Sequence, residues 1–358
     1  MPYLVATVDK GAPWRETLKL WAKRPSRDRA VLEPREVRVK IMASGLAFPD
    51  VLTAEDKHVR PLGKTPKVMG KELAGVVTES TSEKFKVGDW VFGETTQGAW
   101  GESCILMESE THRFDPNKVD FKVVAGLALN YGTVYHALVH IAEIKKGEIL
   151  LVLGAGGGVG LGAVEIGKAR GAIVIACASS KEKLDLCRKS GADYLVNYTD
   201  KDWALQVEKI SGGKAARDLK DKGGVDVVFD PVGGAFSEPA LRMLRFQGRH
   251  IVVGFASGGD HPKSSIPKIP LNLALLNERK IMGVLFGTWR AQHFKENYEM
   301  VEELVRMLER GEIKPQVQAF PLRDWYTAIE QLMGRQAAGK IVFTEMDDPR
   351  GAVTASKL

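Results

Sequence analysis

Short apolar runs, broken by glycine, proline and charged residues, make up the chain as far as about residue 125. In Val37-Arg38-Val39-Lys40-Ile41-Met42, apolar and charged positions alternate, which is typical of a strand with one buried face. Gly75-Val76-Val77 and Asp89-Trp90-Val91-Phe92 are further short runs of this kind. We therefore expect the first part of the chain to form a mostly β lobe.

The pattern changes at Gly147, where continuous apolar runs begin to alternate with helical stretches. The apolar runs are 149–153, 172–177, 225–229, 250–253 and 280–286, and the first helices are 161–170 and 181–189. This alternation is typical of a parallel sheet covered by helices on both faces. A long helix at 291–310, a short helix at 325–333 and a last strand at 340–344 complete the expected fold, and a polar tail follows.

Composition narrows the class of protein. With 358 residues, 44% hydrophobic and 27% charged, the chain predicts an ordinary soluble protein of about two domains. We expect no membrane span, because no apolar run reaches the ~18–20 residues required. Three cysteines are too few for a disulfide framework, and the first residues resemble no secretory signal. The net charge of +6 favours a solvated surface over a nucleic-acid groove, because the densest patch, 214–222, alternates in sign and has no aromatic residue.

A glycine-rich segment lies between the first apolar run and the following helix. We call Gly154 to Gly160, in the sequence Gly-Ala-Gly-Gly-Gly-Val-Gly, the glycine loop. Glycines at this position let the backbone approach a pyrophosphate, whose charge then faces the N–H groups at the start of the helix. The segment predicts a dinucleotide site, and a tight turn without a ligand is the alternative.

The residues after the second apolar run bear on the choice of dinucleotide. An NAD site usually has Asp or Glu about 20 residues after the glycines. Here the run ends in Ser179-Ser180-Lys181-Glu182-Lys183, and we expect Glu182 to lie inside the helix and point elsewhere. Hydroxyl and ammonium groups suit a 2′-phosphate, so this segment predicts NADPH.

Several motifs in a fixed order carry a resemblance to a known family. They are Ser44-Gly45-Leu46-Ala47-Phe48-Pro49-Asp50, Gly70-Lys71-Glu72-Leu73-Ala74-Gly75, Phe85-Lys86-Val87-Gly88-Asp89-Trp90-Val91, Tyr131-Gly132-Thr133-Val134-Tyr135-His136-Ala137-Leu138, the glycine loop, Gly191-Ala192-Asp193, Asp230-Pro231-Val232-Gly233-Gly234 and Gly339-Lys340-Ile341-Val342. From about Val37 to Thr344 the chain resembles the zinc-free quinone oxidoreductase branch of the medium-chain dehydrogenase/reductase superfamily. The segment 277–289 looks most like a quinone-oxidoreductase-like group known from vertebrates.

The resemblance implies an α/β fold in which a doubly wound Rossmann sheet accompanies a GroES-like, mostly β catalytic domain. The implied boundaries are 1–126 and 288–346 for the GroES-like domain, 127–287 for the Rossmann domain and 347–358 for a flexible tail. It also implies contacts to NADPH. The pyrophosphate of NADPH would contact Gly157, Gly158, Val159 and Gly160. The 2′-phosphate would contact Ser180, Lys183, Tyr198 and Arg335. The nicotinamide end would contact Thr133, Phe255, Ala256, Leu285 and Phe286.

The chain departs from the family's patterns at the metal site. Zinc-dependent relatives have Cys and His where this chain has Ala47 and Lys71. Because zinc prefers thiolate and imidazole ligands, we expect no metal. The zinc-free branch usually has Asn at position 47, so no role of that Asn carries over. The absence of Tyr from Asp50-Val51-Leu52-Thr53 weakens the resemblance to enoyl-thioester reductases.

Without a metal, the expected reaction is hydride transfer from NADPH to a quinone or another electron-poor conjugated carbonyl. The product anion needs a hydrogen-bond donor and a proton, and Tyr131 and Lys71 are the candidate donors. The alternatives are that Tyr131 forms a wall of the cleft and that Lys71 is a solvated side chain. Phe48, Trp100 and Trp289 are candidates for an apolar substrate pocket, with core packing as the alternative. Reduction of 2-alkenals or enoyl thioesters, and a non-enzymatic NADPH-binding or RNA-binding role, stay open.

Two expectations concern assembly and location. The family pairs the last Rossmann strand, here 280–286, with its two-fold mate, which predicts a homodimer. The sequence ends in Ser356-Lys357-Leu358, the tripeptide that a peroxisomal import receptor reads. It predicts a peroxisome or a related microbody such as a glycosome, with the cytoplasm as the alternative.

Overall fold

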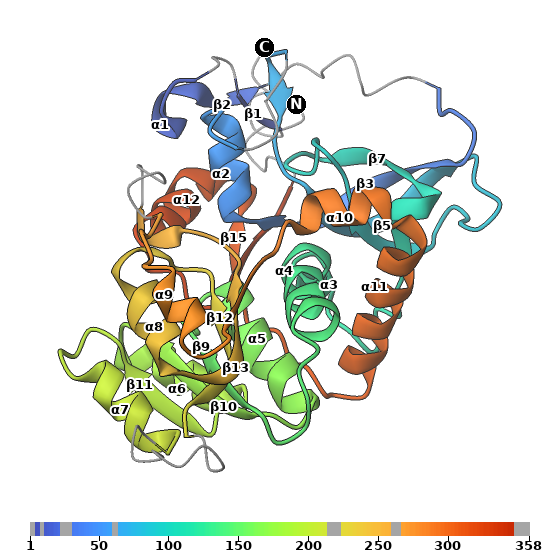
Figure 1. Cartoon of the computed structure of the whole chain (residues 1–358). Coiled ribbons are helices and arrows are strands. Elements are labelled where there is room, and N and C mark those ends of the chain that lie inside the picture. The colour runs from blue at the N-terminus through green and yellow to red at the C-terminus, as the bar shows by residue number, and fades with distance from the viewer. Residues whose placement is uncertain are drawn as a thin grey trace. The chain divides into compact units, whose positions relative to one another are not determined.

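The computed structural model describes residues 4–7, 11–21, 31–58, 64–212, 223–258 and 266–346. The chain forms two compact units, and Figure 1 shows both. One unit comprises residues 1–129 and 317–358, and the other comprises residues 130–316. The segments 214–222 and 347–358, which include the charged patch and the terminal tripeptide Ser356-Lys357-Leu358, lie outside the described residues.

The first unit is built on a mixed sheet in the order β15-β16-β3-β5-β6-β8, with β7 paired to β3. All pairs are antiparallel except β15 with β16. Its strands are β3 (Glu36–Leu46), β5 (Glu72–Ser80), β6 (Trp90–Glu94), β7 (Ser103–Met107), β8 (Thr111–Arg113), β15 (Val317–Pro321) and β16 (Lys340–Thr344). A smaller sheet contains β1 (Leu4–Thr7), β2 (Leu18–Trp21) and β4 (Lys67–Val68), and the α-helices are α1 (Trp14–Thr17), α2 (Phe48–Ala54), α3 (Phe121–Val124) and α12 (Trp325–Met333).

Strand β3 contains the alternating apolar and charged positions that predicted a strand. Val37, Val39 and Ile41 are at most 2% exposed and belong to one core cluster. Arg38 is nevertheless also buried, and its guanidinium pairs with Glu79 at 3.0 Å. Strand β3 pairs with β5, β7 and β16, and Lys40 is the only exposed residue along it, so both of its faces are covered over most of its length.

The second unit contains a six-stranded parallel sheet in the order β11-β10-β9-β12-β13-β14. Its strands are β9 (Ile149–Val152), β10 (Ile173–Ala178), β11 (Tyr194–Asn197), β12 (Val225–Asp230), β13 (Leu244–Val252) and β14 (Lys280–Gly283). Its helices are α4 (Leu127–Tyr135), the π-helical η2 (His136–Ile141), α5 (Gly158–Ala169), α6 (Lys181–Lys189), α7 (Trp203–Ile210), α8 (Ser237–Met243), α9 (Asn272–Leu275), α10 (Phe286–Gln292) and α11 (Phe294–Glu309).

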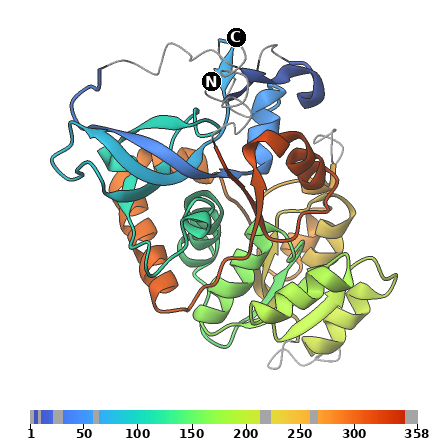
Figure 2. The same ribbon diagram turned by 180° about the vertical axis from the view of Figure 1, so that it is seen from behind.

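The chain runs outward from β9 to β11 and then returns to β12, on the other side of β9. Helices α5 and α6 pack on each other and on the β9–β11 half, and α7 and α8 pack on each other beside β11, β12 and β13 (Figure 2). The expected doubly wound sheet is confirmed. Ligands of such sheets bind where the strand order reverses, at the carboxyl ends of the strands, here β9 and β12.

Three expectations about the C-terminal half need correction. The last sheet strand ends at Gly283, and Phe286 begins α10 instead of continuing the strand. The long helix expected at 291–310 is interrupted at His293, between α10 and α11. Residues 288–316 belong to the compact unit that holds the parallel sheet, because Trp289 stacks on His136 of that unit, with ring centroids 4.2 Å apart.

Candidate functional site

The glycine loop joins β9 to α5 and has the geometry of an anion cradle. Gly154 has a φ of +60°, and a Cβ on Gly160 would collide with the Gly154 carbonyl oxygen. Helix α5 starts with Gly157 as its N-cap, where no side chain accepts from the first N–H groups. Backbone N–H groups at a helix start bind phosphate well, so the loop fits a pyrophosphate.

A buried carboxylate organises the neighbouring loop after β12. Asp230 is 1% exposed, and its Oδ1 accepts from the N–H groups of Val232 and Gly233, both at 2.9 Å. The Ser237 hydroxyl donates to Oδ2 at 2.5 Å, and His250 Nε2 lies 3.1 Å from the same oxygen. Burial raises the pKa of Asp230, but these bonds and the His250 ring bring it below its usual value. Sequence reasoning noted the motif around Asp230 but missed Ser237 and His250.

The start of α6 meets the glycine loop. Ser180 is the N-cap of α6, and its Oγ accepts from the Lys183 N–H at 3.4 Å. The stem of Lys183 covers the loop so closely that a Cβ on Gly156 would lie 2.6 Å from the Lys183 Cβ. Tyr198, which follows β11, packs its ring on Phe236, with centroids 4.7 Å apart. The structure thus brings Lys183 to the loop and places Ser180 at the start of the same helix, whereas Arg335 belongs to the first unit, and the contacts of these residues with a 2′-phosphate stay a prediction.

Residues expected at the nicotinamide lie on α4 and after two adjacent strands. Phe255 and Ala256 follow β13, and the Ala256 N–H donates to the Pro231 carbonyl at 3.1 Å. Leu285 and Phe286 follow β14, the parallel neighbour of β13. The Phe286 ring packs against Gly132, the residue before Thr133, because a Cβ on Gly132 would lie 2.7 Å from the Phe286 Cζ.

Tyr131 does not have the surroundings of a substrate-facing donor. Its side chain is 2% exposed, and its hydroxyl donates to Glu165 Oε2 on α5 at 2.9 Å. Glu165 also accepts from the Ser190 hydroxyl and the Lys314 N–H, both at 2.8 Å. Burial and the Glu165 carboxyl raise the pKa of Tyr131 well above its usual value. The interpretation of Tyr131 as a proton donor is therefore corrected: its hydroxyl connects α4 to α5.

Lys71, the other candidate donor, is held on α2. Its Nζ donates to Thr53 Oγ1 at 2.9 Å and to the Pro49 carbonyl at 3.2 Å, and Thr53 Oγ1 donates to the same carbonyl at 2.6 Å. The nearby Asp50 carboxyl is 1% exposed and accepts from the Ala47 N–H at 2.8 Å. Burial raises the pKa of Asp50, and the Lys71 ammonium opposes that rise. Lys71 is thus a positioned cation rather than a freely solvated one.

The aromatic residues expected to line a substrate pocket have different environments. Trp100 is a core residue, which corrects our expectation: it is fully buried, its Nε1 donates to the Gly45 carbonyl at 3.1 Å, and its ring packs on Phe343. Phe48 is half-buried at the start of α2. Trp289 borders a cavity in the second unit.

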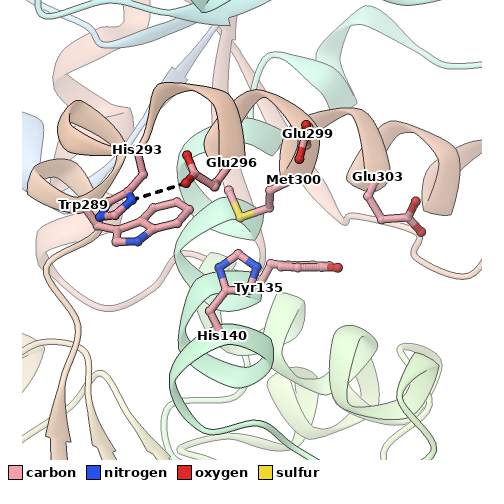
Figure 3. A pocket seen from close by; sticks show the side chains of 8 residues that line it. All are labelled: Tyr135, His140, Trp289, His293, Glu296, Glu299, Met300 and Glu303. Carbon is pink, nitrogen blue, oxygen red and sulfur yellow. Dashed lines mark ion pairs between the residues drawn. The ribbon is translucent and has the colours of Figure 1, made fainter.

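That cavity, of about 460 Å³, lies within the second unit (Figure 3). Besides Trp289 it is lined by Tyr135, His140, His293, Glu296, Glu299, Met300 and Glu303. His136 stacks on Trp289, and burial lowers the pKa of His136 to about 4. Carboxylates and imidazoles do not suit a flat apolar acceptor, so this cavity differs from the substrate pocket that we expected around Trp289.

Within the described residues, no group of three or more His, Cys, Asp or Glu side chains is arranged to hold a metal ion. In the same residues, no helix has the length and hydrophobicity to cross a membrane.

Comparison with known proteins agrees with this architecture. An alcohol dehydrogenase GroES-like domain matches residues 33–143, and a zinc-binding dehydrogenase domain matches residues 158–306. Quinone oxidoreductase-like protein 2 of Bos taurus is 32% identical over 317 residues, which cover 87% of this chain and 86% of that protein. The mouse protein is also 32% identical, with 87% and 85% covered.

Solved structures give the same result. The quinone oxidoreductase of Pseudomonas syringae pv. Tomato DC3000 has a TM-score of 0.81 at 28% identity, over 96% of this chain and 100% of that one. The Escherichia coli quinone oxidoreductase complexed with NADPH has a TM-score of 0.80 at 26% identity, over 96% and 99%. A GroES-like unit with a doubly wound sheet and a glycine loop defines an oxidoreductase of the medium-chain dehydrogenase/reductase superfamily. Within it, the chain belongs to the quinone oxidoreductase-like family.

Proposed function

We propose that the protein is a metal-free, NADPH-dependent oxidoreductase that reduces a quinone or another electron-poor conjugated carbonyl. The start of α5 carries the proposal: its N–H groups have no side-chain cap, and the glycines of the loop leave room for a pyrophosphate beside Ser180 and Lys183. NADPH, when bound there, supplies the hydride. The Escherichia coli relative was solved with NADPH, which supports the same class of cofactor here.

Lys71 is the residue of the first unit that we assign to the product anion. Hydride addition to a quinone or enone leaves a phenolate or enolate, which a nearby ammonium stabilises until it is protonated. Two oxygens of α2 hold the ammonium of Lys71 in place. Lys71→Met should lower kcat and leave the Kd for NADPH unchanged, whereas Lys71→Arg should retain part of the activity.

The acceptor is tested with a steady-state panel of a 1,4-quinone, a 2-alkenal and a trans-2-enoyl-CoA, with NADPH consumption as the readout. We expect the highest kcat/KM with the quinone. The highest value with the alkenal or the thioester would move the assignment to those alternatives. Binding of NADPH without turnover of any acceptor would favour a non-enzymatic role, and RNA affinity that falls steeply with salt would favour an RNA-binding one.

The metal-free part of the proposal depends on the residues at the ligand positions of zinc-dependent relatives. Ala47 has no donor atom, and the Lys71 ammonium has no lone pair for a metal. Elemental analysis should find no stoichiometric zinc, and activity should persist in excess chelator. Chelator inhibition that added zinc reverses would contradict this part.

We also propose a homodimer. Strand β14 is the edge of the parallel sheet, and apolar side chains on and beside it are exposed: Ile281 by 43%, Leu285 by 55%, Leu275 by 78% and Leu276 by 70%. Pairing this edge with a second copy would cover them. Light scattering at micromolar concentration should give twice the chain mass, and a monomer would refute the proposal.

Delivery to a peroxisome or glycosome is a separate proposal. It rests on Ser356-Lys357-Leu358, which an import receptor reads where these residues are the free carboxyl end of the protein. Imaging the full chain beside a variant without the tripeptide tests it. Diffuse signal from both, in cells that contain peroxisomes, would assign the protein to the cytoplasm.

A further inference from the structure

Two histidines of one π-helical turn lie together at the cavity of the second unit. His136 and His140 both belong to η2, and their Nδ1 atoms are 3.3 Å apart. His140 lines the cavity, where its ring lies 5.4 Å from the rings of both Tyr135 and Trp289 (Figure 3). Single π-helical turns are rare in proteins and are found frequently at functional sites. The pair is not used by the proposed function, so we ask what it can bind.

The separation of the two nitrogens fits a small metal ion. Zinc binds an imidazole nitrogen at about 2.0–2.1 Å. An ion at this distance from two nitrogens that are 3.3 Å apart has an N–Zn–N angle of about 105–110°, which is the tetrahedral value that zinc prefers. Metal ligands must also be deprotonated. Burial lowers the pKa of His136 to about 4 and lowers that of His140 as well, so both rings are neutral near pH 7.

The charges around the cavity are of both signs. The Arg170 guanidinium donates to the Tyr135 hydroxyl at 2.6 Å, and its charge opposes a second cation near His140. Three carboxylates line the same cavity: Glu296, Glu299 and Glu303. The first two are paired only at 3.7 Å with His293 and at 3.9 Å with Lys295. Their charge therefore offsets the repulsion from the guanidinium.

We propose that His136 and His140 form a binding site for a tetrahedral divalent metal ion such as zinc. In the part of the chain that the structure describes, no third His, Cys, Asp or Glu side chain completes the ligand set, so water fills the other positions. Two protein ligands hold an ion weakly, and dialysis removes it. The ion takes no part in the proposed hydride transfer. It fixes the His136 ring, which stacks on Trp289 of α10 with ring centroids 4.2 Å apart.

The probe is Co²⁺, because its visible absorption is far stronger in tetrahedral than in octahedral coordination. The full chain is freed of metal with chelator, desalted and titrated with Co²⁺ and then with Zn²⁺. We expect the tetrahedral spectrum at one ion per chain and its loss when Zn²⁺ displaces Co²⁺. His140→Asn, at an exposed position, should weaken Co²⁺ binding by about tenfold or more, since even an outer-shell partner of a metal is worth that much. The matched control His58→Asn, in the first unit, should bind as the wild type does.

Melting temperature gives a second readout that does not depend on the spectrum. Zn²⁺ should raise the melting temperature of the wild type and of His58→Asn, because it binds the folded chain, and it should raise that of His140→Asn much less. An octahedral Co²⁺ spectrum would mean adventitious binding and would overturn the proposal. Equal Co²⁺ affinity of the wild type and His140→Asn would overturn it as well. None of these measurements needs turnover of an acceptor, so the proposed function is tested separately.

Discussion

The start of α5 and the surroundings of α2 handle charge in opposite ways. At α5 the first backbone donors have no side-chain cap, and the loop that precedes them is rich in glycine. Around α2 the charged groups are satisfied within the protein: Asp50 accepts from Ala47, Lys71 is held by Thr53 and Pro49, and Lys340 pairs with Glu72 in the core. The first region is suited to a charged ligand from outside, and the second is suited to holding one cation in a fixed place.

Breaking the ion pair between Lys340 and Glu72 should have the largest effect. Their side chains are 4% and 2% exposed, so Lys340→Met leaves a buried carboxylate without its cation. The free energy of unfolding should fall by about 3–5 kcal/mol, measured by chemical denaturation. The double variant Lys340→Met/Glu72→Gln removes the uncompensated charge and should recover part of this loss. Equal stability of wild type and Lys340→Met would contradict a dry, tightly coupled pair.

Replacing Lys183 tests whether the region around the glycine loop binds the cofactor phosphate. Lys183→Ala should weaken NADPH by about 1–3 kcal/mol, because a charge-assisted bond to the 2′-phosphate is lost. NADH lacks that phosphate, so its Kd should change much less. Isothermal titration with both cofactors checks the difference, and an equal loss for both would reject the assignment of Lys183 to the 2′-phosphate.

Tyr131→Phe should cost about 1 kcal/mol of stability, since one hydrogen bond is lost while Glu165 keeps its other donors. The Kd for NADPH and the pH dependence of kcat should stay as in the wild type. A large fall in kcat without a change in melting temperature would restore Tyr131 as the donor to substrate.

Ionic strength should have the smallest effect of the four, and it separates the exposed charges near the glycine loop from the buried ion pair of Lys340. Raising the ionic strength should weaken NADPH binding more than NADH binding, because the extra phosphate is held by partly exposed charges. The destabilisation caused by Lys340→Met should hardly change over the same range, since buried pairs are little screened. A matching salt dependence of both quantities would show that the two regions do not differ as described.

Much of the second unit could be predicted because its signals are local. Apolar runs, the glycine loop and helix α6 each depend on residues close together in sequence, and α6 has the predicted bounds. The errors concern partners far apart in sequence. Neither Glu165 as the acceptor for Tyr131 nor Phe343 as the neighbour of Trp100 leaves a local signal.

Glu165 has a mechanical consequence beyond its hydrogen bonds. The chain passes between the two units twice, after Leu129 and before Val317. Tyr131 and Lys314, the partners of Glu165, lie within three residues of these crossings. A single carboxylate on α5, the helix that begins at the glycine loop, therefore anchors both connecting segments.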